Sequence, residues 1–492
     1  MPTIVLVEPK SPDRHVFSRW KLPRLGLAML GTRLQEAGYT VKVFVEDVSP
    51  VDFDALLSAD LVGISTITST APRAYEFARA ARQAGIPTVM GGPHVTFLAD
   101  EALEHADYVL RGEADDLIVD FVRKVLGRED LSAFPSLSWH GADGAVVHNP
   151  TATACVDIER LPAPDFSLIA GYQLLPDKVV PVQTSRGCPF DCTFCSVTKM
   201  FGREYRFRST EAVMAELRPL KGRWVFFYDD NFTANVKRAK ELCRAMLAEG
   251  LKLRWSAQVR CDAARDPELM DLMSQAGCYY VYIGMESVHP DVLKCYDKRQ
   301  SVEQIEHAIA EFGKRNIHIH GMFIFGADHD TTETVRATAR FAREHSLASA
   351  QFMILTPLPG TPVFDNMVKE GRILTRDWSL YDAHHVVYRP KKMTTFELQV
   401  ETIRAFGAFY SLAAALKRLV RFDWFTLAIK IWGRHSARQS RRRLKSYVEV
   451  TRAWAREAGQ QVEYRARRTA DDVRLAVSRF DLEALRRDRE RP

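Results

Sequence analysis

The chain has 492 residues, too many for one ordinary hydrophobic core, and this length predicts roughly two to four folding units. Its hydrophobic fraction of 46% and charged fraction of 26% are typical of a globular protein and exclude the disordered and fibrous classes. No run approaches the roughly 20 uncharged apolar residues that cross a bilayer. Residues 1–5 carry no basic leader, so we expect a cytoplasmic protein.

Cysteine and charge are both unevenly distributed. The eight cysteines are few, and only one group of three is clustered, which disfavours a secreted disulfide framework and favours reduced thiols. Residues 411–492 contain 21 Lys and Arg against 10 Asp and Glu, a local balance of +11, so the remainder is about −5 when subtracted from the net charge of +6. An anionic partner would therefore be met at the C-terminal end.

The first part of the chain alternates short apolar runs with helical patterns. Helices are predicted over 25–36 and 74–83, and strands over 3–7, 41–45, 61–65, 88–90 and 108–110. Such alternation is typical of an α/β fold in which helices wrap a parallel sheet. We therefore predict a Rossmann-like, doubly wound domain over residues 1–127.

Small and polar residues follow three of these strands. In doubly wound sheets, ligands bind beyond the carboxyl ends of the strands, and glycines there let the backbone approach a large ligand. The candidates are Ser65, Thr66, Gly91, Gly92, Arg111, Gly112 and Glu113. Glycines that only make turns are an alternative interpretation.

The pattern then changes three times. Residues 128–178 are predicted to be a linker that contains a hairpin over 136–149. Over 179–376, six strand candidates at 179–183, 224–228, 254–258, 279–285, 317–325 and 352–355 predict an open, partial (βα)6 barrel with catalytic groups at the strand carboxyl ends. Residues 377–492 are predicted to be a mainly helical, basic C-terminal extension.

Three cysteines follow the first strand of the predicted barrel. Cys188, Cys192 and Cys195 can each ligate one iron of a [4Fe–4S] cube and leave the fourth iron open. An open iron can chelate the amino and carboxylate groups of a methionine, which an electron-transfer cluster with four cysteines cannot do. Zinc is the alternative, but structural zinc usually takes four ligands in paired clusters, and no second cluster is visible.

The triplet Cys-x3-Cys-x-Phe194-Cys resembles the signature of the radical S-adenosylmethionine superfamily. More narrowly, Gly91-Gly92-Pro93-His94 and Arg111-Gly112-Glu113 resemble the branch that carries an N-terminal cobalamin (B12)-binding domain. The resemblance runs from about residue 4 to residue 398. It implies a [4Fe–4S] cluster held by the triplet, S-adenosylmethionine and cobalamin as cofactors.

The resemblance also implies contacts with S-adenosylmethionine at the ends of later barrel strands. The residues are Tyr228, Asp229, Asp230 and Asn231 near the methionine amino group, Gln258 and Arg260 near its carboxylate or the ribose, Glu286 and Ser287 near the ribose hydroxyls, and Ile324, Gly326 and Leu355 near adenine. The family's usual Gly-Gly-Glu is absent from the second strand. Local roles compete with these contacts: a helix N-cap by Asp230 or Asn231, polar groups at strand ends without a ligand for Gln258, Arg260, Glu286 and Ser287, and core packing by Ile324 or Leu355.

A lower ligand to cobalt is harder to identify. The family's Asp-x-His-x-x-Gly loop corresponds to Asp13-Arg14-His15-Val16-Phe17-Ser18, which lacks the glycine, and this departure favours an ordinary histidine at position 15 over a ligand.

Apolar residues recur at helical spacing in the extension, with Lys and Arg between them, so residues 411–445 predict a basic amphipathic helix. Such a helix can lie on an anionic membrane surface. Packing of its apolar face on the barrel is the alternative.

Together these features predict a radical enzyme that methylates an unactivated carbon of a hydrophobic substrate, such as a lipid, tetrapyrrole or natural product, with cobalamin as the methyl carrier. Flavodoxin or ferredoxin would supply the electrons. Radical oxidative cyclisation or carbon–carbon coupling is the alternative within enzymes. An iron–sulfur sensor that binds nucleic acid through its basic tail is the alternative outside them, and it is disfavoured because a sensor needs no open iron.

Overall fold

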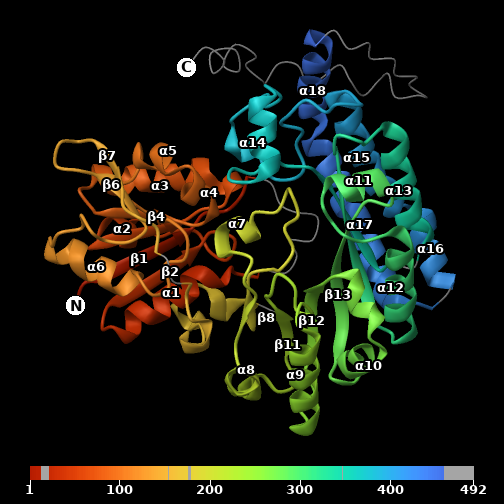
Figure 1. Cartoon of the computed structure of the whole chain (residues 1–492), viewed down its shortest axis with the longest axis horizontal. Coiled ribbons are helices and arrows are strands. Elements are labelled where there is room, and N and C mark those ends of the chain that lie inside the picture. Colours follow the sequence, from red (N-terminus) through yellow and green to blue (C-terminus); the bar gives the residue numbers. More distant parts are fainter. Residues whose placement is uncertain (13–21, 153–154, 176–178, 346, 421, 459–492) are drawn as a thin grey trace.

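A computed structural model describes residues 1–12, 22–152, 155–175, 179–345, 347–420 and 422–458. Two sheets lie side by side, the first at the left of Figure 1 and the second at the lower centre and right, with the helices of the extension behind and above the second. The segment 13–18, which contains the candidate cobalt ligand His15, lies outside the described residues.

The first sheet has the strand order β2-β1-β3-β4-β5-β6-β7. Its parallel strands are β1 (Thr3–Glu8), β2 (Thr40–Val45), β3 (Leu61–Ser65), β4 (Thr88–Gly91) and β5 (Tyr108–Leu110). The helices are α1 (Leu25–Glu36), α2 (Phe53–Leu57), α3 (Ala71–Gln83), α4 (Pro93–Phe97), α5 (Ala99–Leu103) and α6 (Ile118–Gly127). The predicted doubly wound sheet is confirmed.

Strand β1 shows why helices cover both faces of this sheet. Val5 and Val7 are buried in one hydrophobic cluster with α3, whereas Ile4 and Leu6 are buried in another with α1 and α6. Successive side chains of a strand point to opposite faces, so a run of apolar residues must be covered on both sides.

The predicted hairpin belongs to this sheet. Strand β6 (Leu137–His140) pairs antiparallel with β5, and β7 (Val146–His148) pairs antiparallel with β6. The first sheet therefore extends past residue 127, and the prediction of a linker was wrong for these strands. The error arises because a short hairpin has the same turn-rich composition as a connection.

The second sheet consists of six parallel strands in the order β15-β14-β13-β12-β11-β8. They are β8 (Val179–Val182), β11 (Trp224–Phe227), β12 (Arg254–Val259), β13 (Cys278–Glu286), β14 (His318–Phe325) and β15 (Ser349–Ile354). Among the described residues β8 and β15 pair on one side only, so the barrel is open and the predicted partial (βα)6 fold is confirmed. A two-stranded sheet, β9 (Ser185–Arg186) with β10 (Arg206–Phe207), and helix α7 (Val197–Phe201) flank the loop after β8.

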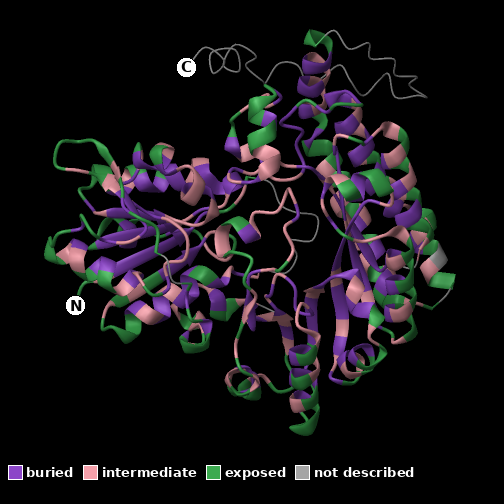
Figure 2. Cartoon of the chain, viewed as in Figure 1, coloured by how far each residue is buried: buried purple, intermediate pink, exposed green. Residues whose placement is uncertain are grey.

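Helices cover the outer face of this open barrel: α8 (Thr210–Leu217), α9 (Val236–Ala248), α10 (Pro267–Gln275), α11 (Pro290–Cys295), α12 (Val302–Lys314) and α13 (Thr332–Glu344). Outward side chains such as Trp255 and Phe352 are completely buried. Their neighbours on the inner face, Phe226, Tyr282 and Gln351, remain partly exposed. Figure 2 shows the resulting buried strands of the second sheet.

Helix α14 (Pro362–Lys369) follows β15 within the range predicted for the barrel, and the extension contains α15 (Thr395–Phe409), α16 (Leu412–Val420), α17 (Trp424–Arg443) and α18 (Lys445–Glu457). The prediction of one amphipathic helix over 411–445 was wrong in two respects. The segment forms two helices, and Lys430 is buried with its Nζ 3.1 Å from the ring centre of Phe409 rather than on a basic face. No helix of the described residues is both long and apolar enough to cross a membrane.

Candidate active site

The three cysteines lie on one loop, residues 187–196, which we call the cysteine loop. It leaves the short strand β9 at the carboxyl end of β8 and enters helix α7. Gly187 opens it with φ 88°, and a Cβ there would lie 2.4 Å from the Glu204 carbonyl oxygen, so the tight entry requires glycine. Cys192 is buried, and Cys188 and Cys195 are half-buried.

Burial keeps these thiols protonated in the absence of metal. It raises the pKa of Cys188 and Cys192, and it raises the pKa of Cys195 to about 12. Binding of iron would supply the positive charge that thiolates need at this site.

The three thiols do not form a preassembled site for a single ion. Within the part of the chain that the structure describes, no three Cys, His, Asp or Glu side chains converge on one ion. A cube needs no such convergence because each thiolate ligates its own iron.

Asp229 holds the base of the cysteine loop. Its buried carboxylate accepts hydrogen bonds from the backbone nitrogens of Thr184 (2.7 Å) and Ser185 (2.9 Å) and from the Thr184 hydroxyl. These bonds fasten β11 to the chain that leads into Cys188. The geometry therefore favours a positioning role over the predicted contact with S-adenosylmethionine.

Asp230 remains the stronger candidate in this segment for a contact with S-adenosylmethionine. Burial, reinforced by Asp229, raises the pKa of its carboxyl to about 7, while a hydrogen bond from the Gly187 backbone opposes this shift. Neither Asp230 nor Asn231 caps a helix, because the N-cap of α9 is Asn235, whose side chain accepts from the Arg238 nitrogen. The structure thus excludes the capping role that competed with a site role.

Two buried cations, Arg260 and Lys298, lie beside the cysteine loop. The Arg260 guanidinium lies 3.7 Å from the ring centre of Phe190 in that loop, and its Nη2 donates to the Lys298 carbonyl at 2.6 Å. Lys298 in turn pairs with Glu286 (Nζ to Oε1, 2.6 Å), and both side chains are buried. Burial alone would lower the pKa of Lys298, but Glu286 and the nearby Cys192 raise it above its ordinary value.

Sequence reasoning missed Lys298. It belongs to no motif and lies 12 positions beyond Glu286. Its segment also braces the loop directly, because the Thr193 nitrogen donates to the Tyr296 carbonyl (3.2 Å) and the Phe194 ring packs edge-on against Tyr296. Only the signature aromatic Phe194 hinted that an aromatic partner would be needed.

Other predicted residues are distributed between site and scaffold. Gln258 donates to the Asp229 carbonyl (3.3 Å) and is partly exposed, whereas the hydroxyl of buried Ser287 accepts from the His289 nitrogen (3.1 Å). Tyr228 ends β11 and packs against a small hydrophobic cluster that includes Leu25 of α1, so it meets the first domain.

Gly326 faces the extension instead of an open site. It has φ 103°, and a Cβ would lie 2.1 Å from the hydroxyl oxygen of Tyr388, which donates to the Gly326 carbonyl at 2.5 Å. This packing departs from the adenine contact predicted for it. Ile324 and Leu355 are buried at the same end of the barrel, which favours the core role that was the alternative.

The carboxyl edge of the first sheet is closely packed. Gly92 has φ 97°, and a Cβ there would lie 2.4 Å from the Thr66 carbonyl oxygen. The Thr66 hydroxyl donates to the Gly91 carbonyl at 2.9 Å, and Ser65 is in register with Gly91. Four of the predicted residues therefore form one small, tight ledge, which suits close approach of a large ligand.

Glu113 joins the first domain to the cysteine loop and to the small β9–β10 sheet. Its carboxylate pairs with Arg186 (2.6 Å), which comes directly before Gly187 of the cysteine loop, and with Arg206 (2.9 Å) of β10. Asp115 also pairs with Arg186, at 2.8 Å. The side chain that was predicted to bind a cofactor thus links the ligand edge of the first sheet to the cysteine loop.

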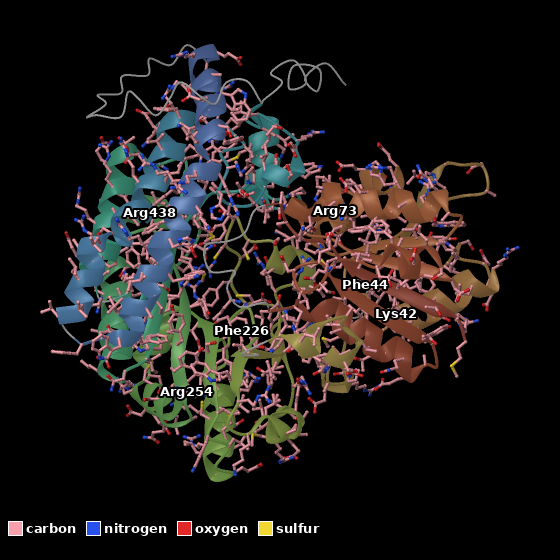
Figure 3. The ribbon with its side chains drawn as sticks, turned by 180° about the vertical axis from the view of Figure 1, so that it is seen from behind. Lys42, Phe44, Arg73, Phe226, Arg254 and Arg438 are labelled. Carbon is pink, nitrogen blue, oxygen red and sulfur yellow. The ribbon has the colours of Figure 1, made fainter. Side chains whose placement is uncertain are left out.

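Contacts within the first domain hold the residues that precede Glu113. The Arg111 guanidinium donates to the Asn149 carbonyl, and the Gly112 nitrogen donates to the Thr96 hydroxyl at 3.0 Å. Figure 3, which views the molecule from behind, shows Phe226 near the middle of the molecule and Arg438 on α17, farther from the first sheet.

A single loop with three thiolates leaves one iron of a cube without a protein ligand, and this defines a class of iron–sulfur enzymes that bind a substrate at the cluster. The radical SAM superfamily model matches residues 182–342, and the B12 binding domain model matches residues 19–122. The chain is 32% identical over 405 residues to an uncharacterized methyltransferase, PH0819, of Pyrococcus horikoshii, covering 79% of this chain and 88% of that relative. The chain belongs to the radical SAM superfamily, in the branch with an N-terminal B12-binding domain.

Two further relatives have named reactions. One is the bacteriochlorophyllide d C-12(1)-methyltransferase of Chlorobaculum tepidum, 29% identical, with 86% of this chain and 91% of the relative covered. The other is the anaerobic magnesium-protoporphyrin IX monomethyl ester cyclase of Cereibacter sphaeroides, 29% identical, with coverage of 86% and 72%.

Solved structures show the same fold. The cobalamin-dependent radical enzyme OxsB with aqua-cobalamin bound aligns with a TM-score of 0.68 at 16% identity, covering 93% of this chain and 76% of that one. The methyltransferase TsrM from Kitasatospora setae, with cobalamin and a [4Fe–4S] cluster bound, aligns with a TM-score of 0.63 at 19% identity, covering 75% of each chain. Family membership implies a [4Fe–4S] cluster and S-adenosylmethionine, and the B12-binding match supports cobalamin.

Proposed function

We propose that this enzyme methylates an unactivated carbon of a hydrophobic substrate, with cobalamin as the methyl carrier. The observation that carries the proposal is the junction in which Glu113 pairs with Arg186. It brings the ligand edge of a B12-binding domain beside the cysteine loop. This proximity supports methyl transfer, because that reaction requires cobalamin and the cluster to reach the same substrate.

Residues at different places in the structure would have different roles in this reaction. Cys188, Cys192 and Cys195 would hold the cluster, and the ledge around Gly92 would accept the corrin. When they are bound, the cluster with S-adenosylmethionine supplies a substrate radical, and cobalamin supplies a transferable methyl group. Asp230 and Gln258 would orient the amino acid part of S-adenosylmethionine. Asp229, Glu286 and Lys298 keep the loop and its surroundings in place.

The partly exposed residues of the inner face suit a large apolar substrate, because Phe226 and Tyr282 present aromatic surface there. A tetrapyrrole is the first candidate, since two of the relatives named above act on tetrapyrroles. Flavodoxin or ferredoxin would deliver the electrons, and the substrate would be met at a membrane surface through residues 411–445.

The test uses anaerobically reconstituted protein with cobalamin, a reductant, S-adenosylmethionine labelled in its methyl group, and chlorophyllide-type tetrapyrroles as probes. We expect both 5′-deoxyadenosine and S-adenosylhomocysteine, with the label in the tetrapyrrole product. Cys188→Ala should abolish both products, and Cys155→Ser, at an exposed cysteine, should not. Absence of both products from the intact protein would overturn the proposal.

Radical cyclisation is the second candidate, because the Cereibacter sphaeroides relative is a cyclase. It would yield 5′-deoxyadenosine without S-adenosylhomocysteine and without label in the product. A nucleic-acid-binding sensor would instead bind DNA in a salt-dependent way and leave S-adenosylmethionine intact.

A further inference from the structure

Large apolar side chains are exposed together where α16 turns into α17. We call this group the α16–α17 tip: Leu412, Leu416, Leu419, Val420, Phe422 and Trp424. Their exposed fractions run from 41% for Leu419 to 78% for Val420, far above those of core residues. Figure 2 shows the exposed residues on α16, at the right edge of the molecule. Contiguous exposed apolar surface on a soluble domain marks a site of interaction.

The apolar residues of α16 lie on one side of the helix. Leu412, Leu416, Leu419 and Val420 follow the spacing of one helical face, whereas Ala415 on another face is only 3% exposed. One face of α16 is therefore packed against the rest of the protein, and a second, apolar face is exposed to solvent.

The tip is held firmly by its neighbours. The ring of Phe425, one residue after Trp424, lies 4.5 Å from that of His318 and 6.2 Å from that of Tyr280, both on barrel strands. At the start of α17 the Asp423 side chain accepts from the Thr426 nitrogen at 3.1 Å. A surface that is fixed before binding loses little conformational freedom when it binds.

The segment that carries the tip has an excess of positive charge. Residues 411–434 contain five Lys and Arg and a single acid, Asp423, and one of the five, Lys430, is buried over Phe409 and does not face solvent. That acid pairs with Arg418 at 3.4 Å, so it does not offset the remaining cations. Exposed apolar side chains on a segment with an excess of cations match the acyl chains and anionic headgroups of a lipid leaflet, and tryptophan is enriched at that interface.

We propose that the α16–α17 tip docks on an anionic membrane surface, with its apolar residues inserted among the lipids. A second copy of the chain fits less well, because the tip would place like charges opposite one another. Only the purpose of this docking rests on the proposed function: it would bring the enzyme to a hydrophobic substrate dissolved in the bilayer. The docking itself requires neither cofactor nor turnover.

The experiment measures flotation of the full-length protein with vesicles of phosphatidylcholine alone or mixed with phosphatidylglycerol. We expect binding to the mixed vesicles that weakens with added salt. The test variant combines Leu416→Ser, Val420→Ser and Trp424→Ser. Because these side chains are 50%, 78% and 61% exposed, the change should not disturb folding. Loss of even one inserted side chain should weaken vesicle binding about ten-fold.

Leu174→Ser is the matched control, since Leu174 is 86% exposed but lies outside the tip, and it should bind vesicles as the unaltered protein does. Failure of the unaltered protein to bind anionic vesicles would overturn the proposal, as would equal loss in the control. Concentration-dependent dimers that the triple variant abolishes, with no vesicle binding, would show that the tip is a protein interface instead. Methylation of detergent-dispersed substrate by the triple variant would stay unchanged, so failure of docking and failure of the proposed reaction are distinguishable.

Discussion

Replacement of Lys298 by methionine tests the buried pair beside the cysteine loop. The change leaves the Glu286 carboxylate in a buried site without the ammonium that lies 2.6 Å from it. Removal of one partner of a buried ion pair costs about 3–5 kcal/mol, whereas replacement of both partners by apolar groups is often nearly neutral. We therefore expect Lys298→Met to be much less stable than the double variant Lys298→Met/Glu286→Leu.

The assay is thermal unfolding of the reduced, metal-free protein under anaerobic conditions. A loss of about 1 kcal/mol lowers Tm by about 2–4 °C in a domain of roughly 150–250 residues, so the single variant should melt about 10 °C lower. The double variant should recover most of that difference. A single variant that melts within about 2 °C of the unaltered protein would refute the reasoning, because the pair would then contribute nothing to the barrel.

Three further changes test other features. Cys188→Ala should remove the iron–sulfur absorption and iron content, whereas Cys155→Ser should keep both, and full iron content in the first variant would contradict the assignment. Burial lowers the pKa of His320 to about 4, below its ordinary value of 6.5, so its contribution of about 3 kcal/mol is present above pH 6.5 and lost as the pH falls towards 4. His320→Gln should flatten the dependence of unfolding free energy on pH in that window, and an unchanged slope would contradict this. Gly92→Ala should weaken cobalamin binding, followed by visible absorption, more than ten-fold, because its Cβ would meet the Thr66 carbonyl. Gly85→Ala has a similar φ with open space around it and should have no such effect.

The parallel strands of both sheets could be predicted from the sequence because they leave a strong local signal. Strand β14 covers Ile317–Phe325 in the prediction and His318–Phe325 in the structure, since a run of apolar and aromatic residues between two helices can form little else. The cysteine triplet could also be recognised from the sequence, because three cysteines within eight positions have few other uses.

The partners of site residues could not be predicted in the same way. Glu113 and Arg186 are 73 positions apart, and nothing local indicates that they meet. Lys430 illustrates the same limit, since a cation within a helical pattern predicts a solvated face, yet tertiary packing buries it over Phe409. Which side chains pair across a junction depends on how whole sheets are placed, and periodicity carries no information about that.

The Glu113 junction has a consequence for engineering. A chimaera that takes its first domain from a relative must bring an acid to the place of Glu113, or Arg186 and Arg206 will be buried with less counter-charge beside the cysteine loop. The B12-binding domain is therefore not a freely exchangeable module. Libraries that recombine the two halves should treat these three side chains as one inherited unit.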